Sequence, residues 1–410
     1  MSAQAGAPTP TPSASLLARL VDACVVGVPL LSGFSIAAMQ ICMGLSIVLG
    51  LSLVVSERRR PALPLAGIFL AYAAAGAVSG LLAGSAEGAL EALKELFAPL
   101  FVYVVVERAR APRLAQRCLD AFCLGAVAMA GFGLWDRYEY GPLYRVRGTL
   151  STYMTYSGVL QLGLMVIAAR VLFAARGLAQ RLAGAAAALL VLYALFLSQT
   201  RGAWLGSALG LGCLCLLRAP RLVLALPALA LLGYLLSPAP VQARMRSVGD
   251  LGDATLATRI EMWRAGRAMW GEHPIWGVGP TRTRERYNEF RTPEDERPWD
   301  DPPGHLHSTP IEIAAERGSI GILLWAALWV GWLRAWWGRW RRAASGPDGE
   351  RALLAASLAG LGAFLAMGLF VCNWYDSEVL TAALTLFGLV LVPQAGARTD
   401  AGACEGGSAG

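Results

Sequence analysis

The sequence predicts an all-α integral membrane protein with about twelve transmembrane helices and one large, partly helical loop outside the membrane. Hydrophobic residues make up 56% of the chain, and the mean hydropathy is +0.51. Long apolar runs that are almost free of charge recur along the chain, as in 34–55 and 61–82. Because a bilayer core takes roughly 20 apolar residues per helix, these runs are better explained as membrane spans than as buried helices of a soluble domain.

The predicted spans form two groups around the large loop. About nine lie in residues 15–236 and the rest in 310–393. We expect them near 15–32, 34–55, 61–82, 89–106, 117–135, 151–173, 182–198, 202–217, 221–236, 310–337, 352–372 and 377–393. The Pro-, Ala- and Ser-rich segment 1–14 and the Gly- and Ala-rich segment 394–410 are expected to be disordered and cytoplasmic.

Charge predicts the orientation of these spans. Arginine-rich loops such as ERRR (57–60) and RWRRAASGPDGER (339–351) follow every second span, and short basic loops stay in the cytoplasm. The large loop, residues 237–309, is then expected to face outward, which in a Gram-negative cell is the periplasm. The net charge of +7 mostly reflects the cytoplasmic loops, so we do not expect nucleic-acid binding.

The large loop holds all three histidines, His273, His305 and His307. Its segment 255–270 has helical period, with Leu256, Ile260, Trp263 and Trp270 on one stripe that also carries Arg259 and Arg267. Arginine in an apolar stripe is costly unless it meets an anion or reaches water. A lipid-linked phosphate or an ordinary phospholipid head group would satisfy it. Pro274 and the glycines after it predict a turn, in which His273 is structural.

A second helix is expected to begin in GHLHSTPIEIAAERGSIG (304–321). Thr309 can cap it, Pro310 suits the first helical position, and Glu312 completes a capping box. His307 then lies just before a helix N-terminus, where partial positive charge favours a bound anion and an uncharged histidine. A metal bound by DDPP (300–303) with the histidines is less favoured, because acids in such proline-rich connectors are commonly solvated.

Arginine also lies at two other outer edges. SQTRGAW (198–204) puts Arg201 at a break between two spans, and YRVRGTLSTY (144–153) puts Arg145 and Arg147 just before another. Arginine at this edge opposes the usual charge bias of membrane proteins. An anionic substrate explains it, and so does chance variation in topology.

SQTRGAW, TRIEMWRAGRAMWGEHPIWGVGP and HLHSTPIEIAAERGSIG, in this order, resemble the motifs of the O-antigen ligase and polymerase family. Those motifs are a Ser-Arg-Gly segment, an Arg-rich helix followed by Pro-x-x-Gly-x-Gly, and a His-Asn before a helix ending in Gly-x-x-Gly. The resemblance covers roughly residues 140–390. It departs at Thr200 and Ser308, where serine and asparagine are usual.

The resemblance implies a C-type glycosyltransferase fold in the bacterial inner membrane. Such an enzyme moves a glycan from undecaprenyl pyrophosphate to an acceptor on the periplasmic side, and for a ligase the acceptor is a sugar of lipid A–core. The ligase reaction is expected to invert the anomeric centre and to need no metal or cofactor. The partners are then the carrier-linked O-antigen, lipid A–core and membrane lipids.

The family histidine corresponds to His305 or His307, and adjacency to the helix favours His307 as general base. Arg201 and Arg259 correspond to the family's arginines, and Arg147 is our additional candidate for the pyrophosphate. Arg145, Arg267 and His305 are secondary candidates. An O-antigen polymerase or an O-linked protein oligosaccharyltransferase would use the same donor. A transporter is less favoured, because charges gather at the outer edges rather than at mid-span.

Overall fold

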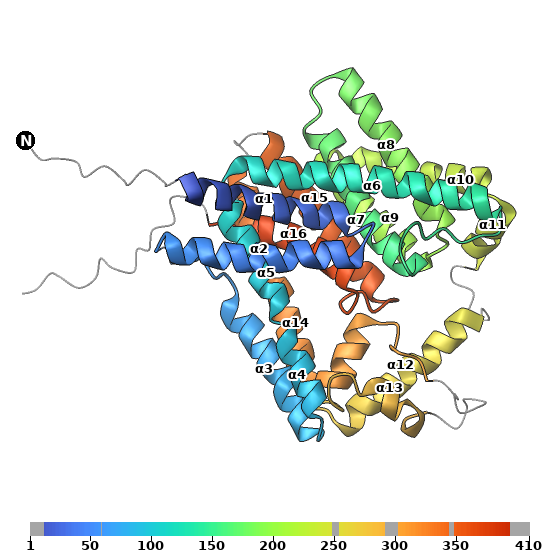
Figure 1. Cartoon of the computed structure of the whole chain (residues 1–410). Coiled ribbons are helices and arrows are strands. Elements are labelled where there is room, and N and C mark those ends of the chain that lie inside the picture. Colours follow the sequence, from blue (N-terminus) through green and yellow to red (C-terminus); the bar gives the residue numbers. More distant parts are fainter. Residues whose placement is uncertain (1–11, 59, 248–253, 292–301, 344–347, 394–410) are drawn as a thin grey trace, which may run out of the picture.

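The computed structural model describes residues 12–58, 60–247, 254–291, 302–343 and 348–393, and all regular elements in these ranges are helices. The all-α class is therefore confirmed for this part of the chain. In chain order the elements are α1 (Pro12–Leu31), α2 (Ile36–Ser56), α3 (Ala66–Leu82), α4 (Ala86–Lys94), α5 (Phe97–Arg108), α6 (Pro112–Tyr140), α7 (Tyr153–Phe173), α8 (Leu178–Leu197), α9 (Arg201–Arg218), η1 (Pro220–Leu224), α10 (Ala225–Leu236), α11 (Ala239–Arg246), α12 (Ala254–Glu272), α13 (Thr283–Arg286), η2 (Tyr287–Glu289), α14 (Thr309–Arg342), α15 (Asp348–Gly368) and α16 (Ser377–Val390) (Figure 1).

Helices coincide with the predicted spans, and two spans are broken. The span expected at 89–106 is divided into α4 and α5, and that at 221–236 into η1 and α10. By length and composition, 6 helices in the described ranges can cross a membrane, namely α2, α6, α7, α8, α14 and α15. Pro220–Leu236, α3 and α16 are shorter apolar helices. The protein is thus a multi-span membrane protein by these criteria, and the count of twelve stays a prediction.

The expected disorder at both ends is only partly open to comparison. Because α1 begins at Pro12, the expectation is wrong for residues 12–14, which continue the first apolar helix by one turn. Segments 1–11 and 394–410 lie outside the described residues.

The centre of the bundle is α7, whose residues from Thr155 to Ala169 are all buried. It packs against α6, α8, α9, α15 and α16 (Figure 1). Small residues allow this close approach. A Cβ built on Gly210 of α9 would lie 2.9 Å from the backbone oxygen of Ala359 in α15. The tight packing of α7 holds its N-terminus at one end of the bundle, beside the start of α9.

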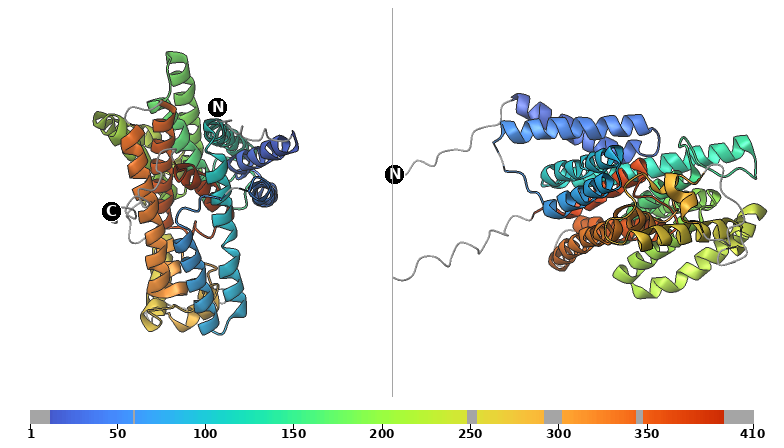
Figure 2. Two further views of the ribbon diagram at one scale, coloured as in Figure 1. Left: turned by 90° about the vertical axis from the view of Figure 1, so that its left-hand side faces the viewer. Right: turned by 90° about the horizontal axis from the view of Figure 1, so that it is seen from below.

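The helix α14 links this bundle to the elements of the large loop. It packs on α3 along one side and on α12 along another, and Figure 2 shows its length in the left view. Gly318 interrupts it with a positive φ of 62°, which glycine adopts without steric cost. The kink divides α14 into an N-terminal part near the histidines and a longer apolar part.

The turn after α12 uses the hydrogen-bonding groups that this kink releases. The amides of Val278 and Gly279 donate to the carbonyls of Ala315 and Glu316, at 2.8 and 3.0 Å. In return, the amide of Ser319 donates to the Pro274 carbonyl at 2.8 Å. The predicted turn is thereby confirmed. These bonds fix the C-terminal end of α12 on α14.

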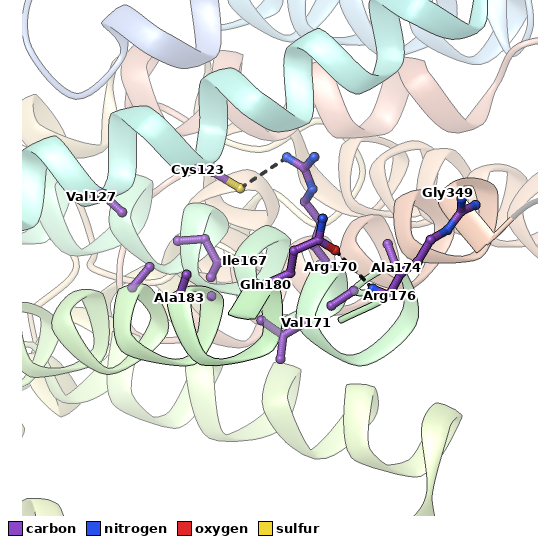
Figure 3. A pocket seen from close by; sticks show the side chains of 13 residues that line it. Cys123, Val127, Ile167, Arg170, Val171, Ala174, Arg176, Gln180, Ala183 and Gly349 are labelled. Carbon is purple, nitrogen blue, oxygen red and sulfur yellow. Dashed lines mark hydrogen bonds between the residues drawn. The ribbon is translucent and has the colours of Figure 1, made fainter. Parts of the chain in front are cut away.

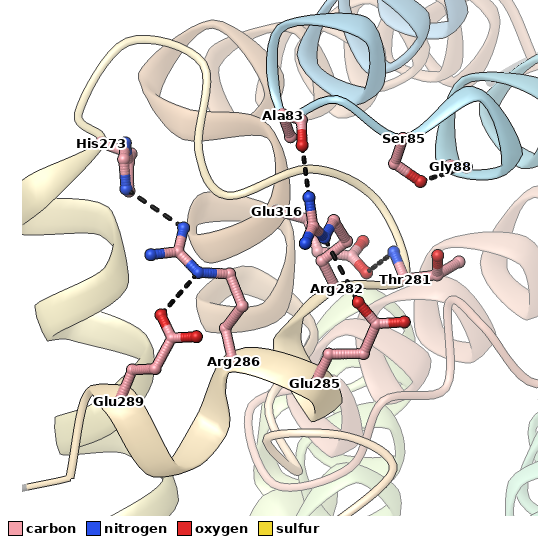
Figure 4. A network of polar contacts seen from close by, with 10 residues as sticks. All are labelled: Ala83, Ser85, Gly88, His273, Thr281, Arg282, Glu285, Arg286, Glu289 and Glu316. Carbon is pink, nitrogen blue, oxygen red and sulfur yellow. Dashed lines mark hydrogen bonds and ion pairs between the residues drawn. The ribbon is translucent and has the colours of Figure 1, made fainter.

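His273 and its neighbours brace the same region, as Figure 4 shows. Its Nε2 lies 3.2 Å from Nη1 of Arg286, whose Nε donates to Glu289 at 2.8 Å. Glu316 accepts a hydrogen bond from the Thr281 amide at 2.7 Å. His273 and Arg286 thus join two segments of the large loop, which agrees with the structural role expected for His273.

Candidate functional site

Four arginines from separate segments meet at one end of the bundle, and we call them the arginine cluster: Arg145, Arg201, Arg244 and Arg259. Arg145 lies in the loop before α7 and Arg201 is the first residue of α9. Arg244 belongs to α11 and Arg259 to α12. Arg201 and Arg244 are both among the charges that lower the pKa of Arg145 and of Arg259, which places the four guanidinium groups within short electrostatic range.

Backbone carbonyls and an aromatic ring hold the first two arginines. Arg145 donates to the Ser198 carbonyl at 3.2 Å and to the Gln199 carbonyl at 2.9 Å, and its Cζ lies 3.3 Å from the ring centroid of Tyr153. Arg201 donates from Nη1 to the carbonyl and the hydroxyl of Ser247, at 2.8 and 3.0 Å. The guanidinium groups are thereby oriented without losing their charge.

Burial, followed by the charges of Arg201 and Arg244, lowers the pKa of Arg259. Burial is also the largest cause of the lowered pKa of Arg145. Within the described ranges, the ion pairs of the chain do not include Arg145 or Arg259. Half-buried like charges that repel one another form a ready site for an anion.

His307 lies beside the arginine cluster, near Arg259. It precedes α14, is half-buried and has a positive φ of 51°, a conformation that costs free energy in a non-glycine residue. Burial, and then the charges of Arg259 and His305, lowers the pKa of His307 to about 4. The imidazole is therefore uncharged at neutral pH. Among the described residues no hydrogen bond involves its ring, so a lone pair is available to accept a proton.

The start of α14 differs from the expected capping box. The N-cap is Ser308 rather than Thr309, and its side chain makes no capping bond. Thr309 donates instead to the Val371 carbonyl at 3.1 Å. Glu312 turns back under the loop and accepts from the Leu306 amide at 2.6 Å and the Thr283 hydroxyl at 2.7 Å. The capping box is wrong because this buried carboxylate instead bonds to the segment 302–308, which we call the histidine loop, and to Thr283.

The buried face of α12 also differs from the expected stripe. Met262, Ala265, Gly266 and Met269 are buried, and a Cβ on Gly266 would contact Leu306 and Ile311. The residues of the expected stripe are not buried. Instead α12 packs on α14 and on the histidine loop through its small and flexible residues. Arg259 lies beside this face. Arg267, about 12 Å further along the helix, is exposed.

The remaining candidates lie outside the arginine cluster. Arg147 is exposed, donates to the Tyr144 hydroxyl at 2.9 Å and the Ser151 carbonyl at 3.0 Å, and lines a cavity of about 420 Å³ beside Ser35. His305 is exposed and stacks on Tyr375, with ring centroids 6.1 Å apart. Sequence reasoning did not single out Arg244 or Tyr153. The only signal for Tyr153 was its position at the start of a span behind two arginines.

One group of side chains has the residue types of a metal site. Ligand atoms of His305, Glu312 and Cys372 lie within 4.8 Å of one another. Both oxygens of Glu312 already accept hydrogen bonds, from Thr283 on one side and from Leu306 and Cys372 on the other. This carboxylate is thus occupied in holding the loop. Asp300 and Asp301, the acids of the alternative metal site, lie outside the described residues.

A cavity lined by arginines lies at the other end of α7, about 30 Å from the arginine cluster by helix length. It has a volume of about 610 Å³ and is lined by Arg170, Arg176 and Cys123 (Figure 3). Its central arginine is already neutralised, because Arg170 pairs with Asp120 at 2.5 Å. The arginine cluster near His307 is therefore the better candidate for an anionic substrate.

The family described as O-antigen ligase matches residues 186–326. This stretch contains the arginines of α9, α11 and α12 together with His307, so the match covers most of the site. A comparison with proteins of curated function found no match. The matched segment, which carries three of the site's arginines and its histidine, is thus similar to the O-antigen ligase family.

Proposed function

We propose that the protein is an O-antigen ligase, a glycosyltransferase that moves a polysaccharide from undecaprenyl pyrophosphate to a sugar hydroxyl of lipid A–core. The reaction takes place on the periplasmic side of the inner membrane and uses no metal. The observation that carries this proposal is the convergence of the arginine cluster with the uncharged His307. The similarity of residues 186–326 to the O-antigen ligase family supports the donor class.

The arginine cluster is suited to a diphosphate. Guanidinium groups form bidentate, charge-assisted hydrogen bonds with phosphate oxygens, and fixed cations stabilise the negative charge that grows as the leaving group departs. Here this role falls to Arg145, Arg201, Arg244 and Arg259. Arg147, which the sequence put forward for the pyrophosphate, is exposed and lies outside the arginine cluster, so this proposal makes it a secondary candidate.

His307 acts as general base. The acceptor hydroxyl attacks the anomeric carbon from the side opposite the diphosphate, a new C–O bond forms, and the bond to the phosphate oxygen breaks. The hydroxyl proton passes to His307, and the electron pair of the broken bond leaves with the diphosphate. Attack from the opposite side inverts the anomeric centre. General base catalysis typically contributes about 10²–10⁴-fold.

The pH dependence of kcat/KM follows from the pKa of His307. Only the uncharged imidazole accepts a proton, and in the free enzyme this form predominates above a pKa of about 4 and is lost as the pH falls through it. We therefore expect kcat/KM to stay constant from neutral pH to about pH 5 and to fall below that. The profile is measured with purified protein, and a fall centred near the ordinary histidine value, about pH 6.5, would contradict the assignment.

Deletion of the gene followed by gel analysis of lipopolysaccharide tests the proposed function. A ligase deletion removes the whole O-antigen ladder, while carrier-linked polymer accumulates. Deletion of a polymerase instead leaves lipid A–core that carries a single repeat unit. A complete ladder in the deletion strain would exclude both, and a phenotype limited to glycoproteins would favour a protein oligosaccharyltransferase.

A further inference from the structure

Another cavity adjoins the histidine loop, and we call it the α3–α14 cavity. Its volume is about 720 Å³, within the ~300–1,000 Å³ range of ligand sites. The wall is formed by α2, α3, α4, α5, α14 and α16 together with the segments 280–284, 304–305 and 374–375. The helices can be followed in Figure 1. His305 lines this cavity, and His307, two residues later, neighbours Arg259. The histidine loop therefore contributes to the cavity through His305 and neighbours the arginine cluster through His307.

The charges of the α3–α14 cavity differ from those of the arginine cluster. Four carboxylates line it, from Glu91, Glu95, Glu312 and Glu316. Two of its cations are already neutralised, because Lys94 pairs with Glu91 and Arg317 pairs with Glu95. A diphosphate entering here would meet a lysine and an arginine that are already paired with carboxylates, whereas Arg145 and Arg259 of the arginine cluster belong to no ion pair in the described ranges. The cavity is thus built for a different ligand from the diphosphate.

Aromatic and polar groups of the wall suit a saccharide. The rings of Tyr72 and Trp374 lie edge to face at 6.2 Å, and the Tyr375 hydroxyl donates to Glu316 at 2.7 Å. The C–H faces of a sugar ring pack on aromatic rings, while its hydroxyl groups donate to carboxylates and accept from arginine. One wall therefore offers both kinds of contact that a sugar needs.

Arg317 points to a ligand independently of the other residues. Its side chain is completely buried and lines the α3–α14 cavity, yet its Nε and Nη1 have no hydrogen-bond partner among the described residues. A buried donor without a partner costs free energy, and the face of Tyr72, 4.5 Å from its Cζ, compensates only in part. A hydroxyl-rich ligand would supply the missing acceptors.

We propose that the α3–α14 cavity binds the sugar residues of the acceptor and presents a hydroxyl to His307, across the loop from the diphosphate. This inference rests on the proposed ligase function. Donor and acceptor thereby occupy two sites of different charge, with the general base on the loop between them. Trp374 and Glu91 are specificity-determining residues for the acceptor.

The test compares steady-state ligation by full-length variants in detergent, with carrier-linked glycan and lipid A–core each varied in turn. Trp374→Leu removes an aromatic surface, and Glu91→Gln removes a charge at a half-exposed position. We expect each to raise KM for the acceptor by about tenfold and to leave KM for the donor unchanged. Trp135→Leu, at an exposed tryptophan of α6, is the matched control and should leave both KM values unchanged.

Three results would decide against this assignment or its premise. Unchanged acceptor KM in both folded variants overturns the acceptor site. A rise in donor KM instead would overturn it too, because the cavity would then hold the donor glycan. Should Trp374→Leu fail to fold, the acceptor KM of Glu91→Gln alone decides between these outcomes. Absence of ligation by the wild-type protein would contradict the proposed function itself, which is a separate outcome.

Discussion

Replacing His307 with alanine is expected to lower the ligation turnover by about 10²–10⁴-fold while donor binding persists. The physical reason is that a sugar hydroxyl is a poor nucleophile until a base removes its proton. The imidazole of His307 is uncharged, free of hydrogen bonds within the described ranges, and next to Arg259. The measurement is kcat of the purified protein, together with a binding assay for undecaprenyl pyrophosphate.

His273→Ala is the matched control for this experiment. His273 lies 3.2 Å from Arg286 and belongs to the brace between loop segments, so its loss should lower thermal stability more than turnover. His307→Gln keeps a polar side chain of similar size and should remain as inactive as His307→Ala. Near-normal turnover in either His307 variant would remove this residue from the base role.

The second large effect is expected from Arg259→Lys. Lysine keeps the positive charge but loses the planar fork that binds phosphate through two hydrogen bonds. Because Arg259 joins the arginine cluster to His307, we expect kcat to fall about 10²-fold, as on removal of one preorganised donor to a transition-state charge. The assay is single-turnover ligation with saturating donor.

Arg267→Lys serves as the matched control, since it makes the same change on the same helix at an exposed position. Its rate should stay close to that of the wild type. Equal losses in the two variants would indicate a general effect on α12 rather than a contact between Arg259 and phosphate. An unchanged rate in Arg259→Lys would exclude a bidentate role.

Local signals account for the features that the sequence predicted correctly. Apolar runs set the positions of the helices. Breaks between spans placed Arg145 in a loop before a helix and Arg201 at a helix start, and the structure brings these two places together. His307 and Arg259 were identified by family motifs and by their places beside a helix start and on a helical stripe. Each of these inferences needed only residues close in sequence.

The features that were missed depend on contacts between distant segments. The buried face of α12 is set by Leu306 and Ile311, which lie about forty residues later. The role of Glu312 depends on Thr283 and Leu306. Arg244 lies in a polar helix without a motif. It is recognised as part of the site only because the fold brings it near Arg259, where Arg201 also lies. The α3–α14 cavity needs segments from Gln40 to Leu384 at once. Periodicity cannot predict such contacts.

A structure of the full-length protein with undecaprenyl pyrophosphate, determined by electron cryomicroscopy in a lipid nanodisc, tests the central claim most directly. We predict that both phosphates lie among Arg145, Arg201, Arg244 and Arg259, with His307 facing the site of the anomeric carbon. Phosphate density in the carboxylate-lined α3–α14 cavity, or at Arg170 on the far end of α7, would contradict the account.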